Sequence, residues 1–228
     1  MTTYYKILKK QMEDQADFLQ AKKMAAYMKN QFLFYGIPSP KRKTLYKDFL
    51  KEEKTKKMVD WELLDQCFED QHREFQYFVC DYLVALASYI PFEEVDRIQA
   101  YIQKGNWWDT TDALDQVIGK MGLRDTRIKQ EMILWTKSDE IWIKRAAIDH
   151  QLLYKEKTDT QLLETILLNC LGSHEFFIDK AIGWALRQYS KTNPRCVESF
   201  VKQHHTALSS LTIKEASKYL TKKKTCEQ

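Results

Sequence analysis

Two tryptophans and two aspartates lie together within residues 106–112, at the start of a segment whose apolar spacing is helical. The apolar positions that follow are Leu114, Val117, Ile118 and Met121. At about 100° per residue they share one stripe with Trp107, which predicts a core position for that ring. Trp108 and Asp112 are spaced i, i+4 and share the other face. This pair is either a half-buried ring beside a solvated carboxylate or a site for a flat or cationic ligand.

An arginine lies in the apolar stripe of a second predicted helix, residues 139–154. The apolar residues of that stripe are Ile141, Trp142, Ala146, Ile148, Leu152 and Leu153. Arg145 projects into the middle of this set, and a buried guanidinium needs a partner. The partner is either an internal aspartate or glutamate, or a group that arrives with the ligand, such as a phosphate.

A third predicted helix, residues 175–190, combines aromatic residues with cations. Its core positions are Ile178, Ile182, Ala185 and Tyr189. Phe177 and Trp184 lie at the edge of that stripe, and Lys180 and Arg187 lie beyond them. Aromatic residues interleaved with cations suit nucleic acid, and they equally suit helix packing in which long cationic side chains reach toward solvent.

A basic run, Lys41, Arg42 and Lys43, follows Ser39 and Pro40. Serine followed by proline predicts an N-cap and first residue for a helix over residues 40–53. The cap either stabilises only the helix or, together with the cations and the free N–H groups, forms a binding site for a phosphate.

Helical periodicity extends over the whole chain and predicts an all-α protein. Two helices are expected at residues 3–13 and 16–29, followed by an apolar linker. The predicted pairs that follow are 59–69 with 74–88, 92–103 with 107–119, 125–136 with 139–154, 160–171 with 175–190, and 194–204 with 212–221. Repeats of this length predict an α-solenoid with a curved, concave binding surface. We expect one domain, residues 1–228, composed of basic N-terminal helices (1–57), helix pairs (58–222) and a short polar tail (223–228).

Stacked pairs would align the three predicted helices at residues 107–119, 139–154 and 175–190. Asp112 and Arg145 are 33 residues apart, and Arg145 and Trp184 are 39 apart, each close to one repeat. Each residue lies on the second helix of its pair. The helical wheels leave open whether the side chains converge, because Trp108 and Trp184 lie on opposite sides of their local core stripes.

Composition excludes several classes of protein. The chain is 44% hydrophobic and 30% charged, with no apolar run near the roughly 18 residues that span a bilayer. The N-terminal charges are Lys6, Lys9, Lys10 and Glu13, which interrupt any signal-like segment. Five separated cysteines without a C-x-x-C pair indicate neither a disulfide framework nor zinc. No phosphate-binding, dinucleotide-binding or H-E-x-x-H motif is present, and His204 and His205 lack the spacing of a metal site. We expect a cytoplasmic monomer of the bacterial cytosol, without membrane partner, metal or cofactor.

The charge distribution is uneven. Residues 1–57 hold 14 lysines and arginines against 6 acidic residues, whereas the rest of the chain holds 22 against 26. A second group of lysines gathers near the C-terminal end. These basic ends are either solvated helix faces or a footprint for a polyanion.

The chain resembles the DNA alkylation repair family of HEAT-like-repeat DNA glycosylases, the AlkD type, from about residue 24 to 200. The motifs that carry the resemblance are Tyr27-Met28-Lys29-Asn30, Gly36-Ile37, Trp107-Trp108-Asp109-Thr110-Thr111-Asp112, Lys144-Arg145-Ala146-Ala147 and Phe176-Phe177-Ile178-Asp179-Lys180-Ala181-Ile182-Gly183-Trp184-Ala185-Leu186-Arg187. The resemblance implies an aromatic cleft of Tyr27, Trp108 and Trp184. It also implies a catalytic carboxylate at Asp112 and a backbone-contacting arginine at Arg145.

We therefore expect a glycosylase that releases 3-methyladenine and 7-methylguanine from double-stranded DNA in base excision repair. The expected catalytic residues are Asp112, Trp108 and Trp184, and the expected DNA-binding residues are Tyr27, Arg145, Arg187, Lys180, Ser39, Lys41 and Arg42. A cationic purine leaves without a general acid, so one carboxylate can stabilise the sugar cation and orient water. Family resemblance further implies that the lesion is engaged without a deep base pocket. The alternative is a non-catalytic helical-repeat scaffold that binds nucleic acid or protein.

Overall fold

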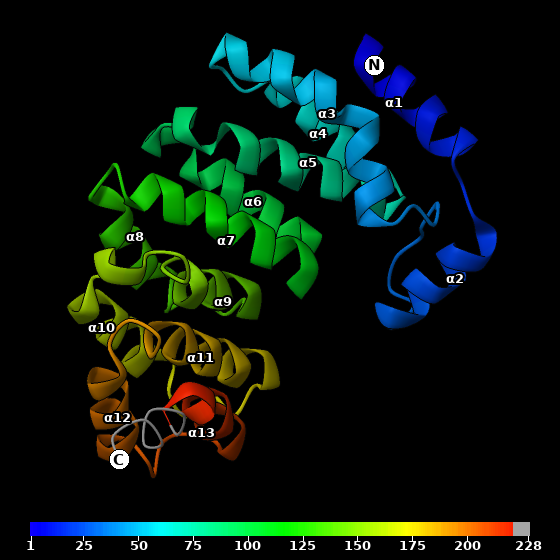
Figure 1. Cartoon of the computed structure of the whole chain (residues 1–228). Helices are drawn as coiled ribbons and strands as arrows, with labels where there is room; N and C mark the ends of the chain where they lie inside the picture. Colours follow the sequence, from blue (N-terminus) through cyan, green and yellow to red (C-terminus); the bar gives the residue numbers. More distant parts are fainter. Residues whose placement is uncertain (221–228) are drawn as a thin grey trace, which may run out of the picture. The chain divides into compact units, whose positions relative to one another are not determined.

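The computed structural model describes residues 1–220, within which the chain is all-α with no strand, as predicted (Figure 1). The chain forms two compact units, Met1–Ile90 and Pro91–Gln228. The prediction of a single repeat domain stays a prediction. The predicted polar tail at residues 223–228 lies outside the described residues. No described helix is both long and apolar enough to cross a membrane.

The first unit contains five α-helices. They are α1 (Thr3–Asp14), α2 (Phe18–Tyr27), α3 (Ser39–Lys56), α4 (Trp61–Phe68) and α5 (Arg73–Leu86). The linker between α2 and α3 is held by the buried Glu74 carboxylate of α5, which accepts backbone N–H bonds from Tyr35, Gly36 and Ile37 at 2.9–3.1 Å. Gly36 has φ +90°, and a Cβ there would lie 2.1 Å from the Asp17 carbonyl oxygen, so the turn requires glycine.

Two predicted boundaries in this unit are wrong. Helix α2 is shorter than 16–29, because the Asp17 side chain caps its start by accepting from the Gln20 N–H. Ser39 is the first residue of α3 and not its N-cap. The N-cap position belongs to Pro38, which makes no side-chain cap bond. The predicted helix starts one residue too late because proline is tolerated at the second helical position as well as at the first.

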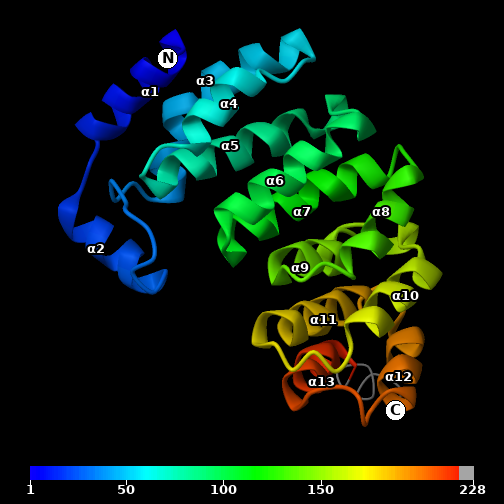
Figure 2. The same cartoon turned by 180° about the vertical axis from the view of Figure 1, so that it is seen from behind.

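The second unit consists of stacked helix pairs (Figure 2). Its α-helices are α6 (Val95–Gly105), α7 (Trp108–Gly122), α8 (Arg127–Trp135), α9 (Ile141–Asp149), α10 (Thr160–Cys170), α11 (Phe176–Tyr189), α12 (Pro194–Gln203) and α13 (Ser210–Ala216). The second helices of successive pairs are neighbours, since α7 packs on α9, and α9 packs on α11. This α-solenoid-like order agrees with the predicted architecture. The helices that carry Asp112, Arg145 and Trp184 therefore form one layer.

Glycine allows α7 and α9 to approach closely. A Cβ at Gly119 would lie 2.3 Å from the carbonyl oxygen of His150, so a side chain at this position would force the helices apart. The carbonyl of Gly119 in turn accepts a hydrogen bond from the Tyr154 hydroxyl at 2.5 Å. This contact fixes the spacing between the two helices that carry Asp112 and Arg145.

Helix α9 is shorter than predicted. It ends at Asp149 instead of residue 154, and a turn followed by the short helix η3 (Lys155–Lys157) completes the segment. The apolar residues beyond Asp149 extended the predicted periodicity, although Leu153 is exposed. Helix α13 is likewise shorter than the predicted 212–221.

Candidate functional site

The Asp112 carboxylate and the Arg145 guanidinium form a two-point ion pair between α7 and α9. Arg145 Nε donates to Asp112 Oδ1 at 2.7 Å, and Nη2 donates to Oδ2 at 2.9 Å. The third nitrogen, Nη1, donates to the backbone carbonyl of Phe177 on α11 at 2.9 Å. The arginine side chain is 2% exposed, whereas that of Asp112 is 22% exposed. Of the two partners that the sequence left open for Arg145, the internal aspartate is the one observed.

The residue at which α7 begins determines where Asp112 lies on the helix. Trp107 has an extended backbone (φ −161°, ψ 157°) and precedes α7, and its carbonyl accepts the Thr111 hydroxyl at 2.9 Å. The helix therefore begins at Trp108, so that Asp112 lies one turn into it. Trp107 is half-buried instead of a core residue, and its ring contacts Trp142 and Phe177 at centroid distances of 5.6 Å each. The prediction of a core position was wrong because it extended the helical wheel to a residue outside the helix.

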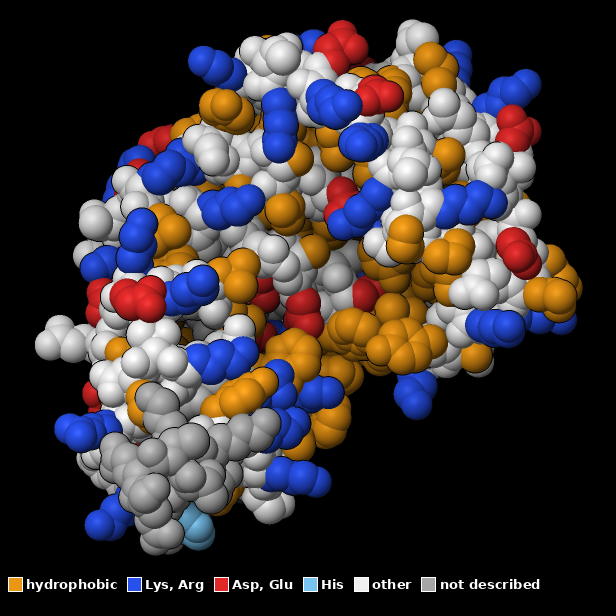
Figure 3. Space-filling model, in the orientation of Figure 1, with side chains coloured by type: hydrophobic (Ala, Val, Ile, Leu, Met, Phe, Trp, Pro, Cys, Tyr) orange, Lys and Arg blue, Asp and Glu red, His pale blue; other side chains and the backbone are white. Residues whose placement is uncertain are grey.

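Trp184 is surrounded by cations. Its half-buried ring lies 5.4 Å from the Arg145 guanidinium, 5.5 Å from the Lys180 ammonium and 5.5 Å from the Arg187 guanidinium. Arg187 also pairs with Glu215 of α13 at 2.6 Å. Figure 3 shows hydrophobic and cationic side chains mixed on the surface near the start of α11. The aromatic–cation pattern read from the sequence thus forms a real cluster around one ring.

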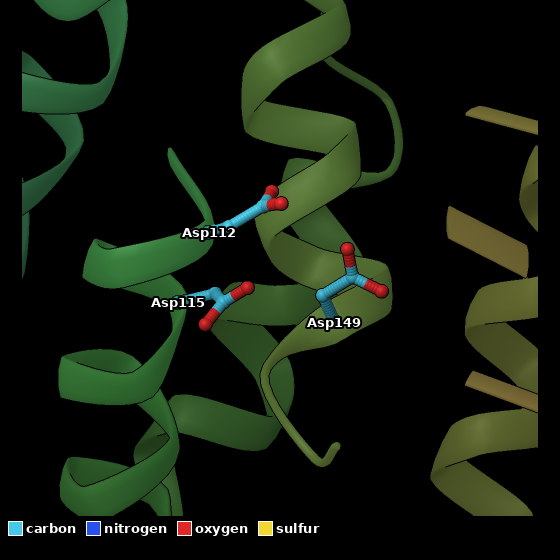
Figure 4. A group of neighbouring side chains, drawn as sticks. All are labelled: Asp112, Asp115 and Asp149. Carbon is cyan, nitrogen blue, oxygen red and sulfur yellow. The ribbon is translucent and has the colours of Figure 1, made fainter. Parts of the chain in front are cut away.

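Two further carboxyls, Asp115 and Asp149, lie beside the Asp112–Arg145 pair. Carboxylate oxygens of the three aspartates lie within 4.8 Å of one another. In Figure 4, Asp112 and Asp115 project from α7 toward α9, which carries Asp149. Sequence reasoning missed both residues, although Asp149 follows Arg145 by four positions, the spacing of an ion pair along one helix. The distance from Arg145 Nε to Asp149 Oδ2 is 3.7 Å.

Burial governs the protonation of these two carboxyls. Burial, opposed by Arg145 and reinforced by the charge of Asp112, raises the pKa of Asp149 to about 8. Burial and the charges of Asp149 and Asp112 raise the pKa of Asp115 well above its usual range. Desolvation dominates at both sites because the residues are only 1–2% exposed. Two of the carboxyls near this guanidinium, those of Asp115 and Asp149, are therefore harder to ionise than an ordinary aspartate because their pKa values are raised.

A cavity of about 580 Å³ opens over this cluster. Its lining includes Asp112, Asp115, Asp149, Trp184 and Arg187, and all of these residues belong to the second unit. The cavity thus combines acidic, aromatic and cationic side chains. It can accept a ligand that carries both positive and negative groups.

Trp108, the first residue of α7, is half-buried and is not among the residues that line the cavity, and the remaining predicted site residues belong to the first unit. Tyr27 is 70% exposed, and Ser39 and Lys41 are exposed. Arg42 is buried, where its Nε donates to the Tyr46 hydroxyl at 3.1 Å. The DNA-binding roles of these four residues stay predictions, and Arg42 is committed to an internal contact in this structure.

Comparisons with known proteins identify what the chain is similar to. A family model described as "DNA alkylation repair enzyme" matches residues 8–220. A solved structure described as a predicted DNA alkylation repair enzyme from Enterococcus faecalis is 38% identical, with a TM-score of 0.83. The similarity covers 91% of this chain and 97% of that one. No curated protein matches the chain.

Proposed function

Because the chain belongs to the DNA alkylation repair enzyme family, we propose that it is a DNA glycosylase that hydrolyses the N-glycosidic bond of cationic N3- and N7-alkylated purines in duplex DNA. The family supports a role in DNA repair, and the glycosylase chemistry rests on the site. Its products would be 3-methyladenine or 7-methylguanine and an abasic site, which is the start of base excision repair. The reaction needs no cofactor.

The observation that carries the proposal is the oriented Asp112 carboxylate at the wall of the cavity. Departure of a cationic purine leaves positive charge on the sugar, and an oriented carboxylate stabilises that charge. The two-point bond to Arg145 fixes the carboxylate rotamer before the substrate arrives. The exposed fraction of Asp112, 22%, leaves room for water and sugar to approach. Asp112 would therefore stabilise the sugar cation and orient the attacking water.

The two tryptophans would contact the lesion nucleotide. Cation–π contacts with Trp108 and Trp184 would contribute about 0.5–2 kcal/mol each, and they would favour charged over normal purines. The cations around Trp184 repel a positively charged base, so the Asp112 carboxylate must attract the base. Discrimination would thus depend on both the rings and Asp112.

Phosphate binding is the role that we propose for the cations. Lys180 and Arg187 lie on α11 near the cavity, and Lys41 is exposed at the start of α3. Three of the five N–H donors of Arg145 are used internally and its side chain is only 2% exposed, so in this structure it holds Asp112, and its predicted contact with the DNA backbone stays a prediction. Affinity for duplex DNA should fall steeply with salt, because each phosphate contact releases counterions. We propose that the protein acts as a monomer on DNA in the bacterial cytosol.

Asp112→Asn tests the chemical step. The change keeps the size of the side chain and an oxygen that can accept from Arg145, but it removes the charge paired with this buried guanidinium, so it should lower stability while the protein still folds and binds DNA. Single-turnover release of 7-methylguanine from methylated duplex DNA should slow by about 10²- to 10³-fold, after subtraction of enzyme-free depurination. The matched control is Asp139→Asn, an exposed aspartate before α9, which should release base at the parent rate.

The proposal fails if folded Asp112→Asn protein, bound to lesion DNA, releases base at nearly the parent rate. It also fails if the parent protein releases no methylated base while binding DNA. That second result would favour the non-catalytic scaffold.

A further inference from the structure

The cluster of three aspartates contains more carboxyl groups than its one arginine can neutralise. Asp112, Asp115 and Asp149 bring three carboxyls within 4.8 Å of one another, and Arg145 is the cation paired with them. If all three ionise, the cluster has a residual charge of −2. A site of this composition must take up protons or bind another cation.

Three of the carboxyl oxygens are buried without a hydrogen-bond partner among the described residues. They are both oxygens of Asp149 and Oδ2 of Asp115. The Nε of Arg145 lies 3.7 Å from Asp149 Oδ2, beyond hydrogen-bond distance, because its N–H is directed at Asp112. Buried carboxyl oxygens almost always have a donor or a bound ion. These oxygens are therefore able to bind a proton or a cation.

The other charged and titratable groups that line the cavity are not bonded to these three oxygens. Lys120 on α7 is exposed, and Arg187 on α11 is paired with Glu215 at 2.6 Å. His150, the residue after the end of α9, bonds to the Ala147 carbonyl, and burial lowers its pKa to about 4, so it is neutral at pH 7. The Tyr154 hydroxyl is committed to the Gly119 carbonyl.

We propose that Asp112, Asp115 and Asp149 bind one divalent metal cation of the Mg²⁺, Mn²⁺ or Ca²⁺ class. The ion would cancel the residual charge of −2. Donors that are all carboxylate oxygens select hard cations. Oxygen ligands of such ions lie about 2.1–2.6 Å from the metal and hence at most about 4–5 Å from each other, which fits the cluster. The cavity offers access from solvent and room for water ligands.

The ion would compete with protons. Burial favours the protonated forms of Asp115 and Asp149, and a metal ion would displace those protons. The proposed site does not depend on glycosylase activity, since its ligand and its test involve no DNA. It is a binding site in the second unit, whose residues apart from Asp112 have no assigned part in the reaction.

The test is calorimetric titration of Mn²⁺ into EDTA-treated, DNA-free protein at about pH 8. We expect one saturable site with a Kd of about 1 mM or tighter. Asp115→Asn and Asp149→Asn should each weaken binding by at least about tenfold, because each removes one charged ligand. Asp139→Asn, outside the cluster, should bind Mn²⁺ like the parent. Circular dichroism checks that each variant is folded.

Anomalous scattering from Mn²⁺-soaked crystals of the parent provides a test that needs no variant. A peak between Asp115 and Asp149 would support the site. Absence of saturable binding up to about 10 mM Mn²⁺ would overturn it and assign protons to the cluster. Binding of equal strength in the parent and both cluster variants would also overturn it, because the ion would then lie elsewhere.

Discussion

The stability of the metal-free protein should depend on pH through Asp149, and Asp149→Asn should remove that dependence. Burial raises the pKa of Asp149 to about 8 in the folded protein, against 3.8 for an ordinary aspartate. The folded state therefore binds a proton that the unfolded state has released between these two values. The free energy of unfolding contributed by this group is largest below pH 4 and falls as the pH rises to about 8.

The size of the effect follows from the pKa difference. One pH unit within this range corresponds to about 1.4 kcal/mol, so at pH 7 the unfavourable contribution of Asp149 is about 4 kcal/mol. Asparagine does not titrate, but it leaves a buried amide to satisfy, which costs about 1–3 kcal/mol. We therefore expect Asp149→Asn to be more stable than the parent by about 1–3 kcal/mol at pH 7. Near pH 4 it should be equal or less stable.

Urea denaturation in EDTA at several values between pH 4 and pH 8 measures the difference. The stability of the variant relative to the parent should increase with pH and level off above about pH 8. Asp139→Asn, at an exposed position, should follow the parent curve throughout. Parallel curves for Asp149→Asn and the parent, or a variant that is less stable at pH 7, would refute the reasoning that burial keeps this carboxyl neutral.

Three further substitutions test the supports of the site. Arg145→Met leaves the Asp112 carboxylate without its buried partner and should lower the free energy of unfolding by about 3–5 kcal/mol in urea denaturation, and a loss under 1 kcal/mol would contradict the ion pair. Gly119→Ala places a Cβ 2.3 Å from the His150 carbonyl oxygen, so it should displace α7 from α9 and destabilise the protein by about 1–3 kcal/mol. Base release should slow as a result, and unchanged kinetics would show that this spacing is not critical. Gly36→Ala adds a Cβ 2.1 Å from the Asp17 carbonyl at φ +90° and should lower the melting temperature, without altering Mn²⁺ binding in the second unit.

The sequence by itself determined the class of fold and the order of the site helices. Apolar residues at helical spacing, separated by glycine and proline, were sufficient to predict an all-α chain of helix pairs. The intervals of 33 and 39 residues then placed Asp112, Arg145 and Trp184 on second helices, which are neighbours in the structure. These features are local or periodic, so they depend little on tertiary contacts.

Tertiary structure decided how the side chains are used. The sequence left Arg145 with two possible partners, and only packing of α7 on α9 selects Asp112, which is 33 residues away. The burial of Asp115 and Asp149 was not predicted, because a carboxyl near an apolar stripe is normally solvated and only the neighbouring helix encloses it. The helical wheel placed Trp107 on the apolar stripe of α7, but its extended backbone places this residue before the helix. Side-chain partners, burial and hence protonation depend on contacts between distant segments, and no single helical wheel contains them.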